Sequence, residues 1–233
     1  MALSTSSVWA NPQGGTVVAG SASIASSGNT VNVTQSTDRA MVNWNSFSIV
    51  AGEVTNFIQP SSSSAILNRV TGGSLSEIYG TINANGHVYL INPNGIVIGK
   101  GGIINTQQFV ASTRDVDASQ FMAKGALTFN GTSEGGVQNF GTITALGGDI
   151  HLIGATVNND GTLNAPNGVV GMAAGNTILL QPEGEERLLI SPLSGSARSG
   201  YGMNNTGLIT AAAAELKAAG GNVYALAVNN GTT

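Results

Sequence analysis

The chain has 233 residues, of which 41% are hydrophobic, 9% are charged and 33 are glycines. This composition excludes a disordered chain, which would be poor in Val, Ile and Leu and rich in charge. The lack of cysteine excludes disulfides and thiolate metal sites, the scattered Lys and Arg exclude a nucleic-acid surface, and no apolar run is long enough to cross a bilayer.

Residues 1–79 contain strand-forming sequence together with the aromatic residues Trp9, Trp44, Phe47 and Phe57. They lie before the first clear repeat of the chain. We expect them to cap one end of a β structure and to supply its first coils.

The segment Asn92-Pro93-Asn94-Gly95-Ile96 joins two short apolar runs, at 88–91 and 96–98. Pro93 fixes a φ angle suited to a turn, and Asn94 and Gly95 tolerate positive φ. The pattern predicts a strand, a tight turn and a second strand.

A repeated unit follows, which reads Gly, any residue, Ile or Leu, any residue, Ala, a short turn and an apolar strand. It begins at Gly80, Gly141, Gly161 and Gly207, and the step from Gly141 to Gly161 is 20 residues. Such a unit is too small to bury its own apolar face, so it must stack on a neighbour as in a parallel β-helix. The inward ladders are predicted to align Ile82, Val88 and Leu90 with Ile143, Ile150 and Leu152 and with Leu163, Val170 and Met172.

The segments between the repeats predict corners and one excursion. Residues 137–140, 157–160 and 203–206 are rich in Asn and are interpreted as corners. Residues 179–202 depart from the repeat and predict a hairpin between 179–180 and 188–190, with a solvated acidic turn at Glu183, Glu185 and Glu186. The last residues resemble the start of another unit, so we expect the stack to continue in a longer protein.

Enzymatic chemistry finds little support. With the copies at Gly80 and Gly141 in register, His87 would lie over Asp149 and His151 over Tyr89. We interpret His151 and Asp149 as an outward, solvated pair rather than a metal or acid–base site. No nucleophile elbow or phosphate loop is present. We therefore expect no enzyme, no cofactor and no metal site.

The order of motifs resembles the amino-terminal secretion domain of two-partner secretion exoproteins, the family of filamentous haemagglutinin-type adhesins, contact-dependent inhibition toxins and haemolysins. The resemblance covers nearly the whole chain and is carried by NWNSFSI (43–49), NFIQPSSSSAILNRVTGG (56–73), IYGTINANGHVYLINPNGIVIGKGG (78–102), FVASTRDVD (109–117), FMAKGALTFNG (121–131) and NFGTITALGGDIHLIG (139–154).

The resemblance implies an all-β fold, a right-handed parallel β-helix with an N-terminal cap and extra-helical hairpin elements. It implies one domain over 1–233, with the cap and first coils in 1–79, coils in 80–178, the excursion in 179–202 and further coils in 203–233. The family's NPNGI secretion motif falls on residues 92–96. Where many members carry an earlier NPNL motif, this chain has Gln59-Pro60-Ser61-Ser62, and we expect Gln59 and Pro60 to take part in transporter recognition together with residues 92–96.

The family further implies a monomeric module, secreted through the periplasm to the surface of a Gram-negative bacterium and recognised by an Omp85-type outer-membrane transporter. The leading hypothesis is a secretion signal and folding nucleus. A β-helical adhesin that binds glycans or host surfaces directly is the second hypothesis, and a carbohydrate-active β-helix enzyme is the third.

Overall fold

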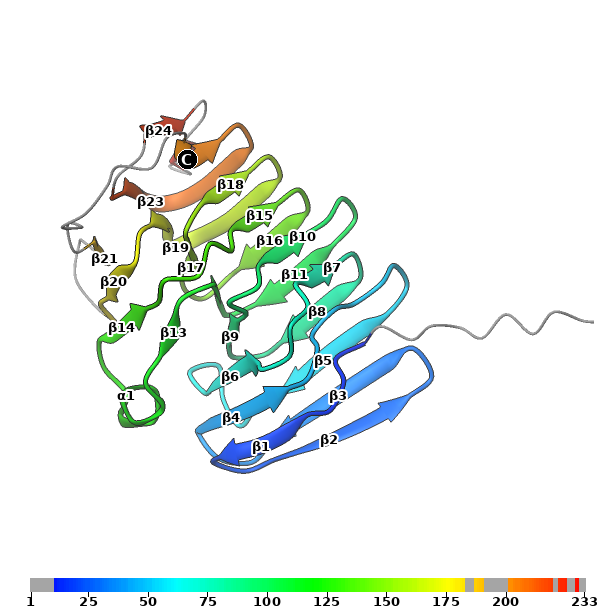
Figure 1. Ribbon diagram of the computed structural model, residues 1–233. Helices are drawn as coiled ribbons and strands as arrows, with labels where there is room; N and C mark the ends of the chain where they lie inside the picture. Colours follow the sequence, from blue (N-terminus) through cyan, green and yellow to red (C-terminus); the bar gives the residue numbers. More distant parts are fainter. Residues whose placement is uncertain (1–10, 183–186, 191–200, 220–221, 226–228, 231–233) are drawn as a thin grey trace, which may run out of the picture.

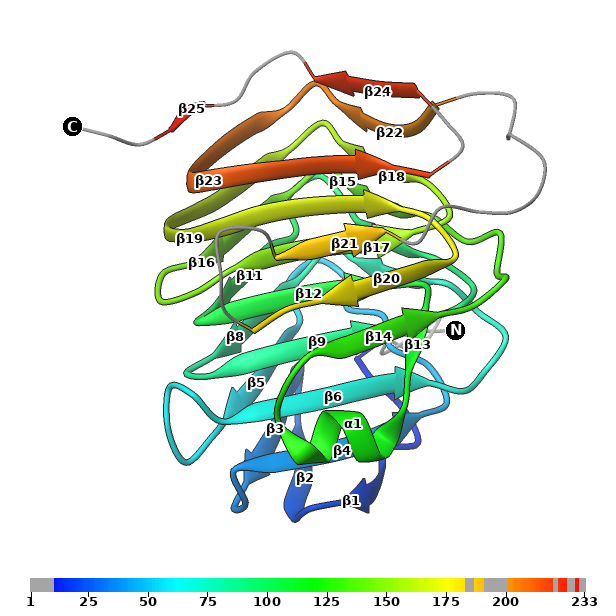
Figure 2. The same cartoon turned by 90° about the vertical axis from the view of Figure 1, so that its left-hand side faces the viewer.

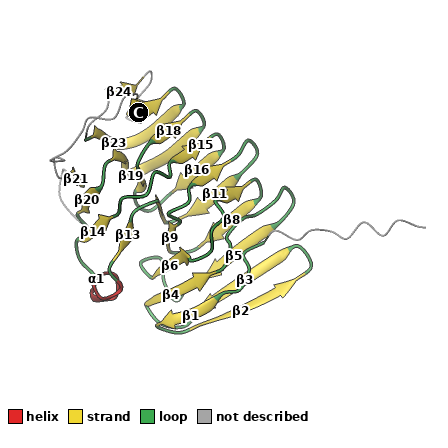
Figure 3. Cartoon of the chain, in the orientation of Figure 1, coloured by secondary structure: helices red, strands yellow, loops and turns green. Residues whose placement is uncertain are grey.

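The structure, a computed structural model, describes residues 11–182, 187–190, 201–219, 222–225 and 229–230. These residues wind into a right-handed parallel β-helix whose coils stack along one axis (Figure 1). Strands dominate the described part, in which the single helix is α1 (Ala118–Ala123) (Figure 3). With six residues, α1 is far too short to span a bilayer, and these ranges hold no other helix.

The coils contribute strands to three faces of the β-helix, and within each face the strands pair in parallel. Face one runs through β3 (Thr30–Gln35), β5 (Val54–Ile58), β8 (Thr81–Ala84), β11 (Ile103–Thr106), β16 (Thr142–Ala145), β19 (Thr162–Ala174), β23 (Leu208–Ala218) and β25 (Asn229–Asn230). Face two runs through β4 (Arg39–Trp44), β6 (Ala65–Val70), β9 (His87–Ile91), β12 (Gln108–Ser112), β17 (Ile150–Gly154) and the second halves of β19 and β23. Face three runs through β7 (Ser76–Ile78), β10 (Ile96–Ile98), β15 (Val137–Asn139), β18 (Val157–Asn159), β22 (Tyr201–Asn205) and β24 (Asn222–Ala225).

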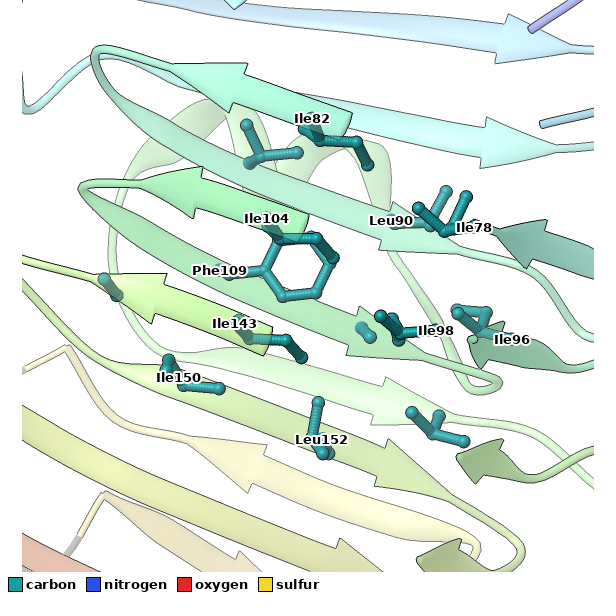
Figure 4. Packing of buried hydrophobic residues seen from close by; sticks show 14 of the residues in the cluster. Ile78, Ile82, Leu90, Ile96, Ile98, Ile104, Phe109, Ile143, Ile150 and Leu152 are labelled. Carbon is teal, nitrogen blue, oxygen red and sulfur yellow. The ribbon is translucent and has the colours of Figure 1, made fainter. Parts of the chain in front are cut away.

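Apolar side chains from the three faces stack inside the coils and form the main core. On face one the parallel register places Ile82, Ile104, Ile143 and Leu163 in one ladder, and all four are buried. Figure 4 shows Ile82, Ile104 and Ile143 of this ladder beside side chains of the neighbouring faces. Because strand side chains alternate, each second residue enters this core and the next one faces outward.

The predicted ladders are correct in phase but incomplete, because the structure contains a further coil between the copies at Gly80 and Gly141. This coil begins at Gly102 and supplies β11 and β12. Its first four residues fit the repeat, but Thr106 takes the place of the alanine and pairs with Ala145. Ile82 therefore lies two coils from Ile143, not directly beside it.

The predicted N-terminal cap is present as two reversed strands. β1 (Thr16–Ala19) pairs antiparallel with β4, and β2 (Ala22–Ser27) pairs antiparallel with β3. Trp44, at the end of β4, and Phe47 are buried in the main core, with their ring centroids 5.7 Å apart. Trp9 lies outside the described residues.

The segments predicted as corners at 137–140, 157–160 and 203–206 prove mainly to be strands of face three. Their asparagines are structural, as expected, but they form a buried ladder. Asn139 Nδ2 donates to Asn159 Oδ1, and Asn159 Nδ2 donates to Asn205 Oδ1, both at 2.7 Å. The ladder satisfies amides that would be costly to bury alone.

An antiparallel sheet covers face two and encloses a second core (Figure 2). It contains β13 (Asp115–Val116), β14 (Leu127–Asn130), β20 (Thr177–Leu180) and β21 (Leu188–Ile190). The predicted hairpin of 179–180 with 188–190 is confirmed by the pairing of Leu179 with Leu189. The acidic residues 183, 185 and 186 lie outside the described residues. The earlier excursion, which carries β13, α1 and β14, was not anticipated from the repeats.

Helix α1 reaches from this cover to the first coils. The Phe121 ring packs edge-on against Tyr89, with centroids 5.3 Å apart, and the Arg39 guanidinium lies 4.9 Å from the Phe121 centroid. Lys124 forms a salt bridge with Asp38. Residues about eighty positions apart in the chain are joined here.

His151 points out of the main coils, as expected, because Ile150 and Leu152 on either side of it point into the main core, but the expectation of a solvated His151–Asp149 pair is wrong. His151 is fully buried beneath the cover, and its Nε2 lies 3.4 Å from Asp149 Oδ2. In register, His87 lies between Ala65 and Gln108, whereas His151 pairs with Val110 and Gly171. The inserted coil and the unanticipated cover explain both errors.

Two carboxylates hold the hairpin against the coils. Glu215 accepts the backbone N–H groups of Arg187 at 2.6 Å and Leu188 at 3.0 Å, and Arg187 Nε lies 3.5 Å from Asp149 Oδ2. Burial raises the pKa of Asp149, but His151, the Val169 N–H and Arg187 outweigh it, so the pKa falls below its usual 3.8. The same balance, set by burial against the two N–H groups and Lys217, lowers the pKa of Glu215 below 4.5.

We predict that Ile104→Ala destabilises the domain by about 2–5 kcal/mol, because it leaves a cavity in the ladder. The matched control is Ile103→Ala on the same strand. Ile103 is 42% exposed where Ile104 is 0% exposed, so its loss should cost less than about 1 kcal/mol. Urea unfolding followed by circular dichroism measures both values, and equal effects would contradict the inward assignment of Ile104.

We predict that the hairpin loses stabilisation in acid. Both carboxylates have a lower pKa folded than unfolded, so their contribution is complete above about pH 4.5 and is lost as the pH falls through their folded pKa values. The free energy of unfolding of the double variant Asp149→Asn, Glu215→Gln should therefore vary less between pH 6 and pH 3 than that of the unaltered chain. Glu77→Gln, which alters an exposed carboxylate, is the control and should retain the original slope.

Candidate functional site

Residues 92–95 form a tight turn between β9 on face two and β10 on face three. The Gly95 N–H donates to the Asn92 carbonyl at 3.1 Å. Proline in the second position and glycine in the fourth fit a type I turn. The predicted strand, turn and strand are observed, but of Asn94 and Gly95 only the glycine has a positive φ, at 123°.

Asn92 is the buried anchor of the turn. Its Nδ2 donates to the Ser74 carbonyl and to Ser76 Oγ, both at 3.0 Å, and both acceptors belong to the preceding coil. Its Oδ1 accepts from the backbone N–H of Asn94 at 2.9 Å and from Asn94 Nδ2 at 3.0 Å. One amide therefore fixes both the shape of the turn and its place on the coil before it.

Pro93 and Asn94 are the exposed residues of the turn. Asn94 Nδ2 also donates to the Gly72 carbonyl at 2.8 Å. A Cβ on Gly95 would meet no atom closer than 3.6 Å, so the glycine is required by its φ and not by lack of space.

Ile96 carries the turn into the core and onto the following coil. Its side chain is fully buried, and its backbone N–H donates to the Gly136 carbonyl at 3.0 Å. β10 pairs in parallel with β7 on one side and β15 on the other. The turn is thus held by three successive coils.

Gln59 and Pro60 lie at a different corner, between β5 and β6. Gln59 is buried, and its Nε2 donates to the Ser64 carbonyl at 2.9 Å and to the His87 carbonyl at 3.3 Å, whereas Pro60 is exposed. His87 begins β9 and Asn92 follows its end, so the two corners are separated by roughly 16 Å of strand. The structure therefore does not bring Gln59 and Pro60 together with residues 92–96.

Sequence reasoning missed the residues that surround the turn. Ser76 pairs with Ile96, a step of 20 residues that the repeat length could have revealed. Ser133, whose Oγ donates to the Pro93 carbonyl, could not be found in this way because an excursion separates the coils. Its position follows only from the three-dimensional path.

The chemistry of this corner is that of amides, hydroxyls and backbone groups. It offers hydrogen-bond donors and acceptors but no side chain that titrates near neutral pH. Among the described residues, no group of three His, Cys, Asp or Glu side chains could hold a metal ion. The arrangement is suited to fixing a backbone conformation and to presenting two side chains.

A second feature is a shallow groove of about 630 Å³ on the outer surface of face one. A ladder of amides runs along it, in which Asn83 Nδ2 donates to Asn56 Oδ1 at 3.1 Å and Asn105 Nδ2 donates to Asn83 Oδ1 at 3.3 Å. The apolar residues Ile58 and Leu146 line it and are 50% and 57% exposed. None of its lining residues is charged.

Comparison with solved structures shows which known proteins share this architecture. The structure is similar to the HMW1 secretion domain from Haemophilus influenzae, with 34% sequence identity and a TM-score of 0.74, over 86% of this chain and 54% of that one. The filamentous hemagglutinin secretion domain shares the fold, with 16% identity and a TM-score of 0.59, over 92% of this chain and 98% of that one.

Among curated proteins, the heme/hemopexin-binding protein of Haemophilus influenzae (strain ATCC 51907 / DSM 11121 / KW20 / Rd) is 42% identical over 106 residues. That alignment covers 46% of this chain and 12% of the relative, so the chain spans only a small part of the length of such proteins. The family model described as TPS secretion domain matches residues 9–233. The chain therefore belongs to the family of TPS secretion domains, which identify exoproteins of two-partner secretion.

Proposed function

We propose that this domain is the secretion signal and folding nucleus of a larger exoprotein, and that an Omp85-type outer-membrane transporter recognises it. The chief support is the turn at residues 92–95, which contacts from three coils hold in one conformation. On this proposal the domain is a monomer without catalytic activity. It passes through the periplasm of a Gram-negative bacterium and ends outside the cell or on its surface.

The transporter would read the chain while it is extended, through edge-to-edge strand pairing and alternate side chains. A chain with 9% charged residues and no cysteine suits this mode, because few charges must be desolvated and no disulfide can lock it early. Outside the cell, each completed coil then presents a strand edge on which the next coil can form. Folding outside the cell would hinder movement of the chain back into the periplasm.

Within this function, the turn acts mainly by fixing the template, and direct contact with the transporter is secondary. The support is the division of labour in the motif. Asn92 and Ile96 are buried and make most of the contacts that join coils, whereas Pro93 and Asn94 are exposed and Asn94 adds one such contact, to the Gly72 carbonyl. The main structural role and a contact role therefore fall on different residues, and substitutions can separate them.

We predict a ranked effect of three substitutions on secretion by cells that carry the cognate transporter. Asn92→Ala removes the hydrogen bonds to the Ser74 carbonyl and to the buried Ser76 hydroxyl and leaves the Asn94 N–H without its acceptor, so it should cost about 2–3 kcal/mol. Gly95→Ala strains a positive φ, at about 1–3 kcal/mol, and Asn94→Ala should cost about 1 kcal/mol or less. Secretion should fall in the same order, as measured by immunoblot of culture medium, with circular dichroism of the purified domains recording stability.

The matched control is Asn130→Ala, because Asn130 is an exposed asparagine that also precedes a glycine. It should be secreted normally. If Asn94→Ala abolishes secretion while the purified domain folds normally, the template role is wrong and direct contact governs export. If all three motif variants are secreted normally, the turn is not the signal.

A second candidate function, direct binding of glycans, is favoured by the groove on face one. Its amide ladder can bond sugar hydroxyls, Ile58 and Leu146 can pack on the apolar side of a sugar ring, and its lack of charge suits a neutral saccharide.

For this candidate we predict that the purified domain binds neutral oligosaccharides on a glycan array, and that Asn83→Ala and Leu146→Ala remove the signal. Asn164→Ala, farther along the same face and outside the groove, should keep it. An array without any signal for the unaltered domain would reject this function and leave the secretory one intact.

A further inference from the structure

The segment 131–136 returns the chain from the first excursion to the β-helix and passes beside the turn at residues 92–95. Ser133 Oγ donates to the Pro93 carbonyl and accepts the Gly135 N–H at 2.9 Å. The Gly136 carbonyl accepts the N–H of Ile96. This return segment therefore contacts the turn at its second residue and again where the following strand begins.

The approach of the two segments is close at Gly135. A Cβ at this position would lie 2.5 Å from the Pro93 carbonyl oxygen and 3.0 Å from the Gly95 nitrogen. Since only glycine avoids this clash, the return segment packs directly on the backbone of the turn. The Gly135 carbonyl accepts from Thr113 Oγ1 at 2.9 Å, which holds the segment from the other side.

Arg114 fixes the return segment from within the protein. Its side chain is fully buried, and its Nη1 donates to the Ser133 carbonyl at 2.6 Å. Its Nε donates to the Gly175 carbonyl at 2.6 Å, and its Nη2 lies 3.2 Å from Asn176 Oδ1. A buried guanidinium is costly unless its donors are satisfied, and this planar fork reaches three acceptors on two segments at once.

The neighbouring backbone links Arg114 to the motif by a second route. Ser112 Oγ donates to the Arg114 carbonyl at 2.7 Å and accepts its N–H at 2.9 Å. The Ser112 carbonyl accepts the N–H of Asn92 at 3.0 Å. The side chain and the backbone of Arg114 thus both lead to the turn within two hydrogen bonds.

We propose that Arg114 and Ser133 are positioning residues of the secretion motif, which act by holding the Pro93 carbonyl and with it the conformation of the turn. This inference rests on the proposed function of the turn. The site therefore extends beyond residues 92–96 to the return segment. This larger site can form only once the return segment, about forty residues after the motif, has also folded.

Ser133→Ala tests the proposal, because it removes one hydroxyl at a half-buried position and should leave the fold intact. It should shift the amide NMR signals of Asn94 and Gly95 and lower secretion about five-fold, the factor that one hydrogen bond of ordinary strength contributes to an equilibrium. Ser133→Thr keeps the hydroxyl and should restore both readouts. Thr132→Ala, at the exposed neighbouring position, is the matched control and should change neither.

Arg114→Lys forms the second arm. Lysine keeps the charge but not the fork, so it cannot reach the Ser133 and Gly175 carbonyls together, and the same two amide signals should move as in Ser133→Ala. Should this variant fail to fold, the Ser133 pair decides the question alone.

The results separate this inference from the proposed function. If Asn92→Ala blocks secretion but Ser133→Ala changes neither the amide signals nor secretion, the inference is wrong and the motif stands alone. If Ser133→Ala shifts the amide signals while secretion is unaffected, Ser133 positions the turn without serving export, and the inference also fails. If Asn92→Ala is secreted normally, the proposed function fails first.

Discussion

The parallel register between successive coils is the constraint on which the rest of the structure depends. Once β8, β11, β16 and β19 pair strand by strand, each inward side chain stacks on the inward side chain of the neighbouring coil, as Ile82, Ile104, Ile143 and Leu163 do. The buried asparagines of face three obey the same rule, since each amide finds its partner one coil away. Apolar and polar ladders are therefore two results of one geometry.

The turn at residues 92–95 shows how this geometry creates a site without catalytic groups. Its conformation depends on Ser74 and Ser76 in the coil before it and on Ser133 and Gly136 in the segment after it. A short peptide of the same sequence would lack these partners. The motif is local in sequence, but its shape is a property of the stack.

Much of the fold could be predicted from the sequence, because a repeat of about 20 residues with alternating apolar positions has few other ways to bury its surface. The repeat pattern did not reveal the coil at Gly102, because Thr106 replaces the expected alanine. It did not reveal the burial of His151 either, because strands from two excursions cover this residue. Ser133 and Arg114 escaped for a related reason, since an excursion breaks the constant spacing by which neighbours in a solenoid are found.

Helix α1 changes how the stack of coils can unfold. A plain stack of repeats has contacts only between neighbours and can fray coil by coil from its ends. In this domain Phe121 and Lys124 reach back to Arg39 and Asp38 in the first coils, and Phe121 also packs against Tyr89 on β9. Because these contacts tie α1 to the first coils, we expect the N-terminal coils to unfold together as one cooperative unit and not one coil at a time.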